Sequence, residues 1–284
     1  MKTAQTAEVF RSGSVRSADG TTIGYRSCGD GPGIIVVHGA LSVADDYEGF
    51  ARALGVGFEV HTLDRRGRGT SGPQGDGYSI DKECDDVLAV QEATGATLLF
   101  GHSFGAFVAL EAAMRAPSSF RALALYEPGV SINGSVTLDW VERCRHELEH
   151  GDGFEAFLTF IRGINPETSG KAPRWLLRLI LPRAMGRREL AAKIALLPTT
   201  ILEHREAARL DDRYGAYVAV SADVLLLAGK DVKRTGAGRA AVELQHVLPN
   251  ASFREFPKLG HFGAEDKPGV VVPVISSFFN TRRP

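Results

Sequence analysis

A serine between two glycines is the residue of this sequence with the clearest capacity for chemistry. Gly101-His102-Ser103-Phe104-Gly105 follows a short apolar run and precedes an alanine-rich stretch. A G-x-S-x-G pattern between a strand and a helix is typical of a nucleophile elbow, whose sharp turn pushes the serine oxygen out of the sheet. The alternative is an ordinary helix N-cap, which becomes the weaker interpretation once the partners of Ser103 are considered. The pattern therefore predicts Ser103 as a nucleophile.

A serine hydroxyl needs a base that takes its proton and an acid that holds the base in one tautomer. The sequence supplies both after Ser103. Asp231 follows the predicted strand Val224–Ala228, and His261 lies 30 residues further on, after the last predicted strand. Open α/β sheets place their sites at these carboxyl ends of strands. The predicted catalytic residues are therefore Ser103, Asp231 and His261.

Two backbone N–H groups must also face the attacked carbonyl oxygen. One is expected from Phe104, the residue after the nucleophile, and the other from Ala40 in the loop His38-Gly39-Ala40-Leu41. His38 is expected to brace this loop. The other histidines, including His61, His204 and His246, are interpreted as surface or packing residues, because they show no metal-ligand spacing. No metal and no cofactor is predicted.

The elements that must position these groups alternate along the chain. Short apolar runs bounded by Gly and Pro alternate with amphipathic stretches, which predicts an α/β fold with a mostly parallel sheet flanked by helices. The interval from about residue 129 to 219 has helix-like segments but no convincing strand. We expect it to form a helical cap inserted into a single α/β core made of residues 1–128 and 220–284.

Composition excludes several other classes of protein. The formal net charge is -1, with 33 basic and 34 acidic residues, which gives no sign of a nucleic-acid or anionic-membrane surface. Three widely spaced cysteines predict neither a disulfide framework nor a zinc site. The first residues lack the apolar core of a signal peptide, and no apolar run approaches the length of a membrane span. We expect a cytoplasmic protein that acts on a small molecule; the sequence does not indicate its oligomeric state.

Together with the Asp64-Arg65-Arg66-Gly67-Arg68-Gly69-Thr70-Ser71-Gly72 segment, these motifs resemble the α/β-hydrolase superfamily from about residue 20 to 280, the cap excepted. The resemblance implies an α/β-hydrolase fold and, for Asp64, Gly67, Gly69 and Ser71, a structural loop beside the Ser103 elbow. Its glycines also match G-x-G-x-x-G, but no helix is expected to follow, so a dinucleotide site is not predicted. The arginines of the loop are expected to be solvated or paired with carboxylates.

The resemblance also leaves a second candidate for the acid. Some members of the superfamily carry it at the end of the strand before the cap, where this chain has Glu127. We favour Asp231, because an acid after the following strand is the commoner arrangement, and expect Glu127 to brace the cap hinge or to contact the substrate.

These residues predict a serine hydrolase that forms an acyl-enzyme and cleaves a small ester-like substrate of the carboxylesterase type. Hydrolysis of C–C, thioester or lactone bonds and cofactor-free perhydrolysis are alternatives on the same residues. A small-molecule signalling receptor with slow turnover is an alternative from another class. The arginines of the cap could attract an acidic substrate, but a solvated helix face is the favoured interpretation. Fold alone does not decide among these functions.

Overall fold

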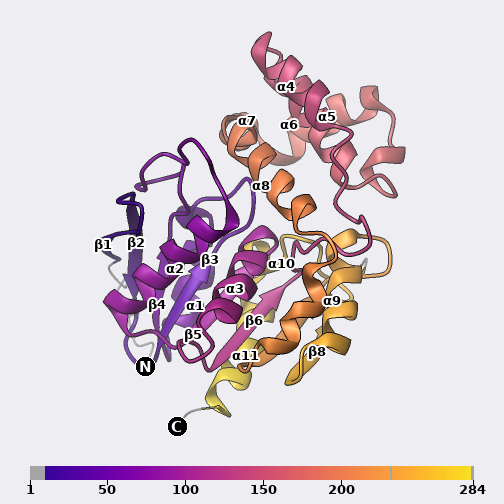
Figure 1. The fold of residues 1–284 in the computed structure, drawn as a ribbon. Helices are drawn as coiled ribbons and strands as arrows, with labels where there is room; N and C mark the ends of the chain where they lie inside the picture. The colour runs from indigo at the N-terminus through magenta and orange to yellow at the C-terminus, as the bar shows by residue number, and fades with distance from the viewer. Residues whose placement is uncertain (1–9, 231, 283–284) are drawn as a thin grey trace, which may run out of the picture.

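An eight-stranded sheet forms the centre of the molecule (Figure 1). The computed structural model describes residues 10–230 and 232–282. Spatial order in the sheet is β1-β2-β4-β3-β5-β6-β7-β8, with β1–β2 and β2–β4 antiparallel and every later pairing parallel. The strands are β1 (Arg11–Arg16), β2 (Thr22–Cys28), β3 (Gly33–Val37), β4 (Glu59–Leu63), β5 (Leu98–His102), β6 (Ala122–Tyr126), β7 (Asp223–Ala228) and β8 (Ala251–Glu255).

The central strands are apolar throughout because helices cover both faces of the sheet. Along β3, Ile35 and Val37 belong to one buried cluster, whereas Ile34 and Val36 belong to another. The first cluster lies under α2 (Ile80–Thr94), α3 (Phe104–Arg115) and α9 (Gly236–Val247), and the second under α1 (Glu48–Leu54) and α11 (Pro268–Asn280). A short α10 (Gly263–Asp266) precedes α11, and the 3₁₀ turn η1 (Ala44–Tyr47) precedes α1. The predicted α/β-hydrolase fold, a mostly parallel sheet flanked by helices, is therefore confirmed.

Between β6 and β7 the chain leaves the sheet and forms a group of helices, which we call the cap (residues 129–219). All residues of this interval are described, and none of them forms a strand. Its helices lie beyond the end of the sheet (Figure 1), where a separate apolar cluster includes Trp140, Phe157, Phe160 and Ile201. The helices are α4 (Val141–Glu149), α5 (Gly153–Ile164), α6 (Arg174–Met185), α7 (Arg187–Ala195) and α8 (Leu197–Arg209), with 3₁₀ turns at η2 (Ser169–Lys171) and η3 (Arg213–Ala219).

The predicted elements and the observed ones differ mainly at the edge of the sheet. Strand β1 was not predicted, because an edge strand with mostly exposed residues carries little apolar pattern. Helices α5 and α8 lie in the interval expected to be helical, and α5 has apolar residues at helical spacing on its inner side. Within residues 10–230 and 232–282, no helix is both long and apolar enough to cross a membrane.

Candidate active site

Ser103 lies at the turn between β5 and α3, with a backbone conformation that few residues adopt. Its φ is 53° and its ψ is −121°, which places it outside the main allowed regions. The flanking glycines are required by packing: a Cβ on Gly101 would lie 2.5 Å from Cα of Ala106, and one on Gly105 would lie 2.2 Å from the carbonyl oxygen of Val37. Ser103 makes no side-chain capping bond to α3. Its hydroxyl is therefore available to another partner.

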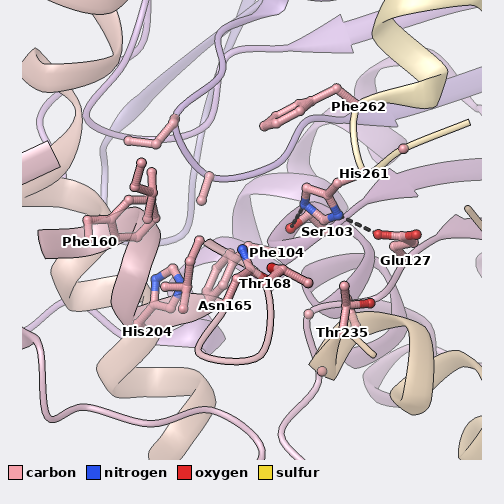
Figure 2. A pocket seen from close by; sticks show the side chains of 18 of the residues that line it. Ser103, Phe104, Glu127, Phe160, Asn165, Thr168, His204, Thr235, His261 and Phe262 are labelled. Carbon is pink, nitrogen blue, oxygen red and sulfur yellow. Dashed lines mark hydrogen bonds and ion pairs between the residues drawn. The ribbon is translucent and has the colours of Figure 1, made fainter. Parts of the chain in front are cut away.

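That partner is His261, which follows β8. Nε2 of His261 lies 3.1 Å from Oγ of Ser103, and Nδ1 of His261 lies 2.6 Å from Oε2 of Glu127 (Figure 2). Glu127 is buried and comes directly after β6, at a φ of 44°. Its other oxygen accepts a hydrogen bond from the N–H of Gly229, at 2.8 Å. The carboxylate, the imidazole and the hydroxyl thus form a continuous chain.

Electrostatics favour an ionised Glu127 beside a basic imidazole. Burial alone would raise the pKa of Glu127, but the hydrogen bond and charge of His261 and the N–H of Gly229 outweigh it and lower this pKa. Burial would lower the pKa of His261, but Glu127 outweighs it and raises that pKa above 6.5. A raised pKa makes the imidazole a stronger base towards the serine proton.

The acid expected from the sequence was Asp231, which lies outside the described residues. The position expected for its carboxylate, at Nδ1 of His261, is occupied by Glu127. The physical reason is the register of neighbouring strands: Tyr126 of β6 pairs with Leu227 of β7, so the loops after both strands emerge at the same edge of the sheet. An acid from the earlier strand can therefore reach His261.

The peptide between Gly39 and Ala40 is held by its carbonyl group. The oxygen of Gly39 accepts hydrogen bonds from Nδ1 of His38 at 3.0 Å and from the guanidinium groups of Arg68 at 2.9 Å and Arg65 at 3.4 Å. In a trans peptide the N–H points opposite to the C=O. The N–H of Ala40 therefore points away from these donors, and Ala40 lines the same pocket as Ser103 and Phe104.

Phe104 is the first residue of α3, so its N–H has no acceptor within the helix. Gly129, at the start of the cap, lies directly over this group: a Cβ there would be 3.1 Å from the Phe104 nitrogen. Gly129 was not singled out from the sequence, although a glycine directly after Pro128 is a usable signal. A larger side chain at this position would crowd the N–H that faces the pocket.

The Asp64 loop is held by hydrogen bonds and ion pairs. Asp64 accepts hydrogen bonds from the backbone N–H groups of Ala44 and Thr70, both at 2.9 Å. Arg65, Arg66 and Arg68 are buried and are paired with carboxylates rather than solvated; the acids are Glu83, Asp86, Asp19 and Glu203. Glu203 belongs to α8 and pairs with both Arg65 and Arg68, so two of these ion pairs connect the loop to the cap.

A cavity of about 560 Å³ lies between the sheet edge and the cap and includes Ser103 and His261 in its wall. Most of its cap side is apolar, with Phe157, Phe160 and Ile164 among the lining residues. Five arginines of the cap do not line it, namely Arg174, Arg178, Arg183, Arg187 and Arg188. Arg174 and Arg178 instead pair with Glu155. Among the described residues, no group of three or more His, Cys, Asp or Glu side chains could hold a metal ion.

Two histidines near the site have roles that the sequence did not indicate. His102 lies beside Ser103 in the elbow and donates a hydrogen bond from Nε2 to the carbonyl oxygen of His261, at 2.8 Å. His204 was interpreted as a surface or packing residue, but besides packing against Trp140 and Phe160 it lines the cavity. That His204 lines the cavity becomes apparent only from the placement of the cap over the sheet.

Comparison with known proteins agrees with the fold. Residues 34–274 match the model of the alpha/beta hydrolase family. A 2-(acetamidomethylene)succinate hydrolase from Mesorhizobium japonicum is 25% identical over 263 residues, which cover 91% of this chain and 92% of that protein. A non-heme chloroperoxidase from Streptomyces lividans is 27% identical over 291 residues, covering 94% and 99%.

A solved structure of an alpha/beta hydrolase from Sphaerobacter thermophilus superimposes with a TM-score of 0.78 at 27% identity, covering 94% of this chain and all of that one. The family match spans most of the sequence. This chain therefore belongs to the alpha/beta hydrolase family, and it is an enzyme of the hydrolase class.

Proposed function

We propose that this enzyme is a serine hydrolase that cleaves a small ester-like substrate through an acyl-enzyme, with Ser103, His261 and Glu127 as its catalytic triad. The observation that carries the proposal is the chain of contacts from Glu127 through His261 to Ser103, at 2.6 and 3.1 Å. Such a chain supplies a nucleophile, a base and an orienting acid in one line. The expected site of action is the cytoplasm.

The roles of the three side chains follow from their hydrogen bonds. The Glu127 carboxylate accepts the Nδ1–H of His261 and leaves Nε2 as the basic nitrogen. His261 takes the proton of Ser103 as the Ser103 oxygen attacks the substrate carbonyl, and then gives this proton to the leaving alcohol. Water, deprotonated by His261, releases the acyl group and regenerates Ser103.

The N–H groups of Ala40 and Phe104 are proposed to bind the oxyanion formed during each attack. The three donors on the Gly39 carbonyl support the role of Ala40, because they fix the orientation of its peptide and draw electron density away from its N–H. A fixed donor pair of this kind typically contributes about 10² to 10³ in turnover for each donor.

A fluorophosphonate probe tests the nucleophile directly. The probe should label Ser103 in the wild-type protein, and peptide mapping should locate the adduct there. Ser103→Ala should abolish labelling and lower the turnover of short p-nitrophenyl esters by about 10⁴-fold or more. Labelling of another serine in the variant, or unreduced ester turnover, would overturn the proposal. Absence of turnover with a broad ester panel, despite labelling, would instead favour a receptor with slow turnover.

Amide cleavage is a second candidate, because a relative that aligns over most of both chains is named for a substrate with an acetamido group. The same three residues can protonate a leaving amine. Matched pairs of esters and anilides with one acyl group distinguish the two: an amidase would process the anilide at a rate comparable with the ester, whereas an esterase would leave it nearly untouched.

A further inference from the structure

Helix α8 brings a histidine to the cavity that takes no part in the proposed triad. His204 lines the cavity, and Figure 2 shows it beside Phe160 and well separated from Ser103 and His261. Its ring packs edge-to-face against Trp140 and Phe160, with ring centres at 5.3 and 5.5 Å. The imidazole is thus held within an aromatic cluster of the cap.

One nitrogen of this imidazole is committed to the backbone. Nδ1 lies 2.9 Å from the carbonyl oxygen of Thr200, one helical turn earlier. A carbonyl oxygen can only accept, so Nδ1 carries the proton. Burial lowers the pKa of His204 to about 4, so the ring is neutral at ordinary pH. A neutral imidazole has one proton, and Nε2 is therefore an unprotonated hydrogen-bond acceptor.

Nε2 makes no hydrogen bond to the described residues. The buried polar side-chain atoms that lack a partner in this part of the chain do not include it, so Nε2 is an unpaired atom that is not fully buried. The atom is therefore accessible, and the space next to this side of α8 is the cavity. An unpaired acceptor on a cavity wall gains from a ligand that donates to it, and it penalises a ligand that places an apolar group or a second acceptor there.

The charged residues of the cavity indicate which ligand group could donate a hydrogen bond to Nε2 of His204. Its described lining residues include four acids, Glu127, Glu189, Glu265 and Asp266. Lys193 is the one lysine or arginine among these lining residues, and its Nζ lies 3.4 Å from Asp46. An anionic ligand group would meet like charges here as well as the lone pair of His204. A neutral hydroxyl or N–H group fits better.

We infer that Nε2 of His204 is a specificity-determining acceptor, which selects substrates whose arm beneath the cap is an apolar, aryl-sized group ending in a neutral hydroxyl or N–H. This inference deepens the proposed function and depends on it for the statement that the bound molecule is a substrate. The binding preference itself can be measured without turnover.

Isothermal titration calorimetry with Ser103→Ala protein measures that preference. The ligands are ethyl 3-(4-hydroxyphenyl)propanoate and its 4-methoxy and unsubstituted analogues, which place the arm on the acyl side. A second series, 4-hydroxyphenethyl acetate with the same two analogues, places it on the alcohol side. In at least one series the hydroxyl compound should bind about tenfold more tightly than the methoxy compound, the usual net value of one hydrogen bond.

Variants at position 204 assign the preference to the imidazole. Adding His204→Phe to the Ser103→Ala background should abolish the preference, since phenylalanine fills the aromatic cluster but accepts no hydrogen bond. His204→Gln should retain part of it, because its amide oxygen can accept. His150→Phe is the matched control: Nδ1 of His150 bonds the carbonyl of His146 in the same way, at 2.8 Å, but on an exposed turn outside the cavity lining. This control should leave the preference unchanged.

A spectroscopic measurement keeps the inference testable even if His204→Phe folds poorly. Nitrogen-15 NMR of the wild-type protein should find the proton of His204 on Nδ1, and addition of the hydroxyl ligand should shift the Nε2 resonance. Equal affinities across both series, or a preference that survives in His204→Phe, would overturn the inference while leaving fluorophosphonate labelling of Ser103 intact. Loss of that labelling would instead overturn the proposed function and leave the binding preference standing.

Discussion

Two histidine–glutamate pairs lie next to each other at the end of the sheet, with the rings of His261 and His102 4.8 Å apart. In the first pair, Nδ1 of His261 bonds Glu127 and Nε2 faces Ser103. In the second, Nδ1 of His102 lies 3.4 Å from Glu265 and accepts from the hydroxyl of Tyr47, while Nε2 donates to the carbonyl oxygen of His261. Each pair places Nδ1 of a histidine near a glutamate carboxylate, but only in the first pair does that carboxylate accept a hydrogen bond from the ring.

The difference lies in what the second nitrogen of each ring meets. Both nitrogens of His102 are used by protein groups, and burial lowers its pKa, so the ring is a neutral connector. His261 keeps one nitrogen for a hydroxyl that opens onto the cavity, and Glu127 raises its pKa. We therefore propose that a histidine next to a carboxylate acts as a base in this protein only where its other nitrogen is left for a reacting group.

The largest expected effect comes from removing the carboxylate charge of each pair in turn. Glu127→Gln should lower kcat by about 10⁴-fold, because the amide favours the wrong tautomer of the base and no longer stabilises its charged form. Glu265→Gln should cost about tenfold or less, since Glu265 does not contact His261 by a hydrogen bond. Steady-state turnover of p-nitrophenyl acetate measures both. A greater loss in Glu265→Gln would reverse the roles assigned to the two pairs.

The second test removes the connector. His102→Phe deletes the donor that fixes the His261 carbonyl and should lower kcat by about 10²-fold, the scale expected when a catalytic group is displaced by about 1 Å. His102→Gln retains an N–H donor and should recover part of the loss. A purely structural role for His102 would lower the melting temperature of both variants without separating their kcat values.

The third test uses pH. His261 must be neutral to accept a proton, so activity should fall about tenfold per pH unit below its pKa, with the midpoint of this acid limb above 6.5 because Glu127 raises that pKa. Glu127→Gln should move the limb to lower pH in whatever activity remains. Glu265→Gln should move it in the same direction by less, because Glu265 acts on His261 only through its charge. A pH–rate profile of kcat/KM from pH 5 to 9 measures these shifts, and identical limbs in all three proteins would contradict them.

Sequence sufficed for the parts of this molecule whose signals are local. The apolar strands, the glycines around Ser103 and the helical interval between β6 and β7 are all patterns of adjacent residues, and each corresponds to an observed element. Strand β1 escaped prediction because its pairing with β2, rather than its own composition, makes it a strand.

The roles of Glu127 as the acid and of His204 in the cavity could not be predicted from local sequence patterns, because both depend on contacts between residues that are far apart in the chain. Glu127 and Asp231 follow neighbouring strands, so the sequence offered both, and only the path of the Glu127 backbone at a φ of 44° directs that carboxylate to His261. His204 on α8 has no motif around it. Its position follows from the way the cap folds over the sheet edge, which Arg68 and Glu203 help to fix.

The smallest expected effect concerns Asp231, the acid first predicted. The Nδ1 of His261 has one proton to donate, and Glu127 already accepts it at 2.6 Å. Asp231→Asn should therefore change kcat by no more than about twofold, far from the roughly 10⁴-fold loss that follows removal of a triad acid. The variant should be measured beside Glu127→Gln and with the same ester, and fluorophosphonate labelling should be timed in both. If Asp231→Asn is the slower enzyme, the orienting role belongs to the later strand, and the contact between Glu127 and His261 serves to hold the imidazole in place.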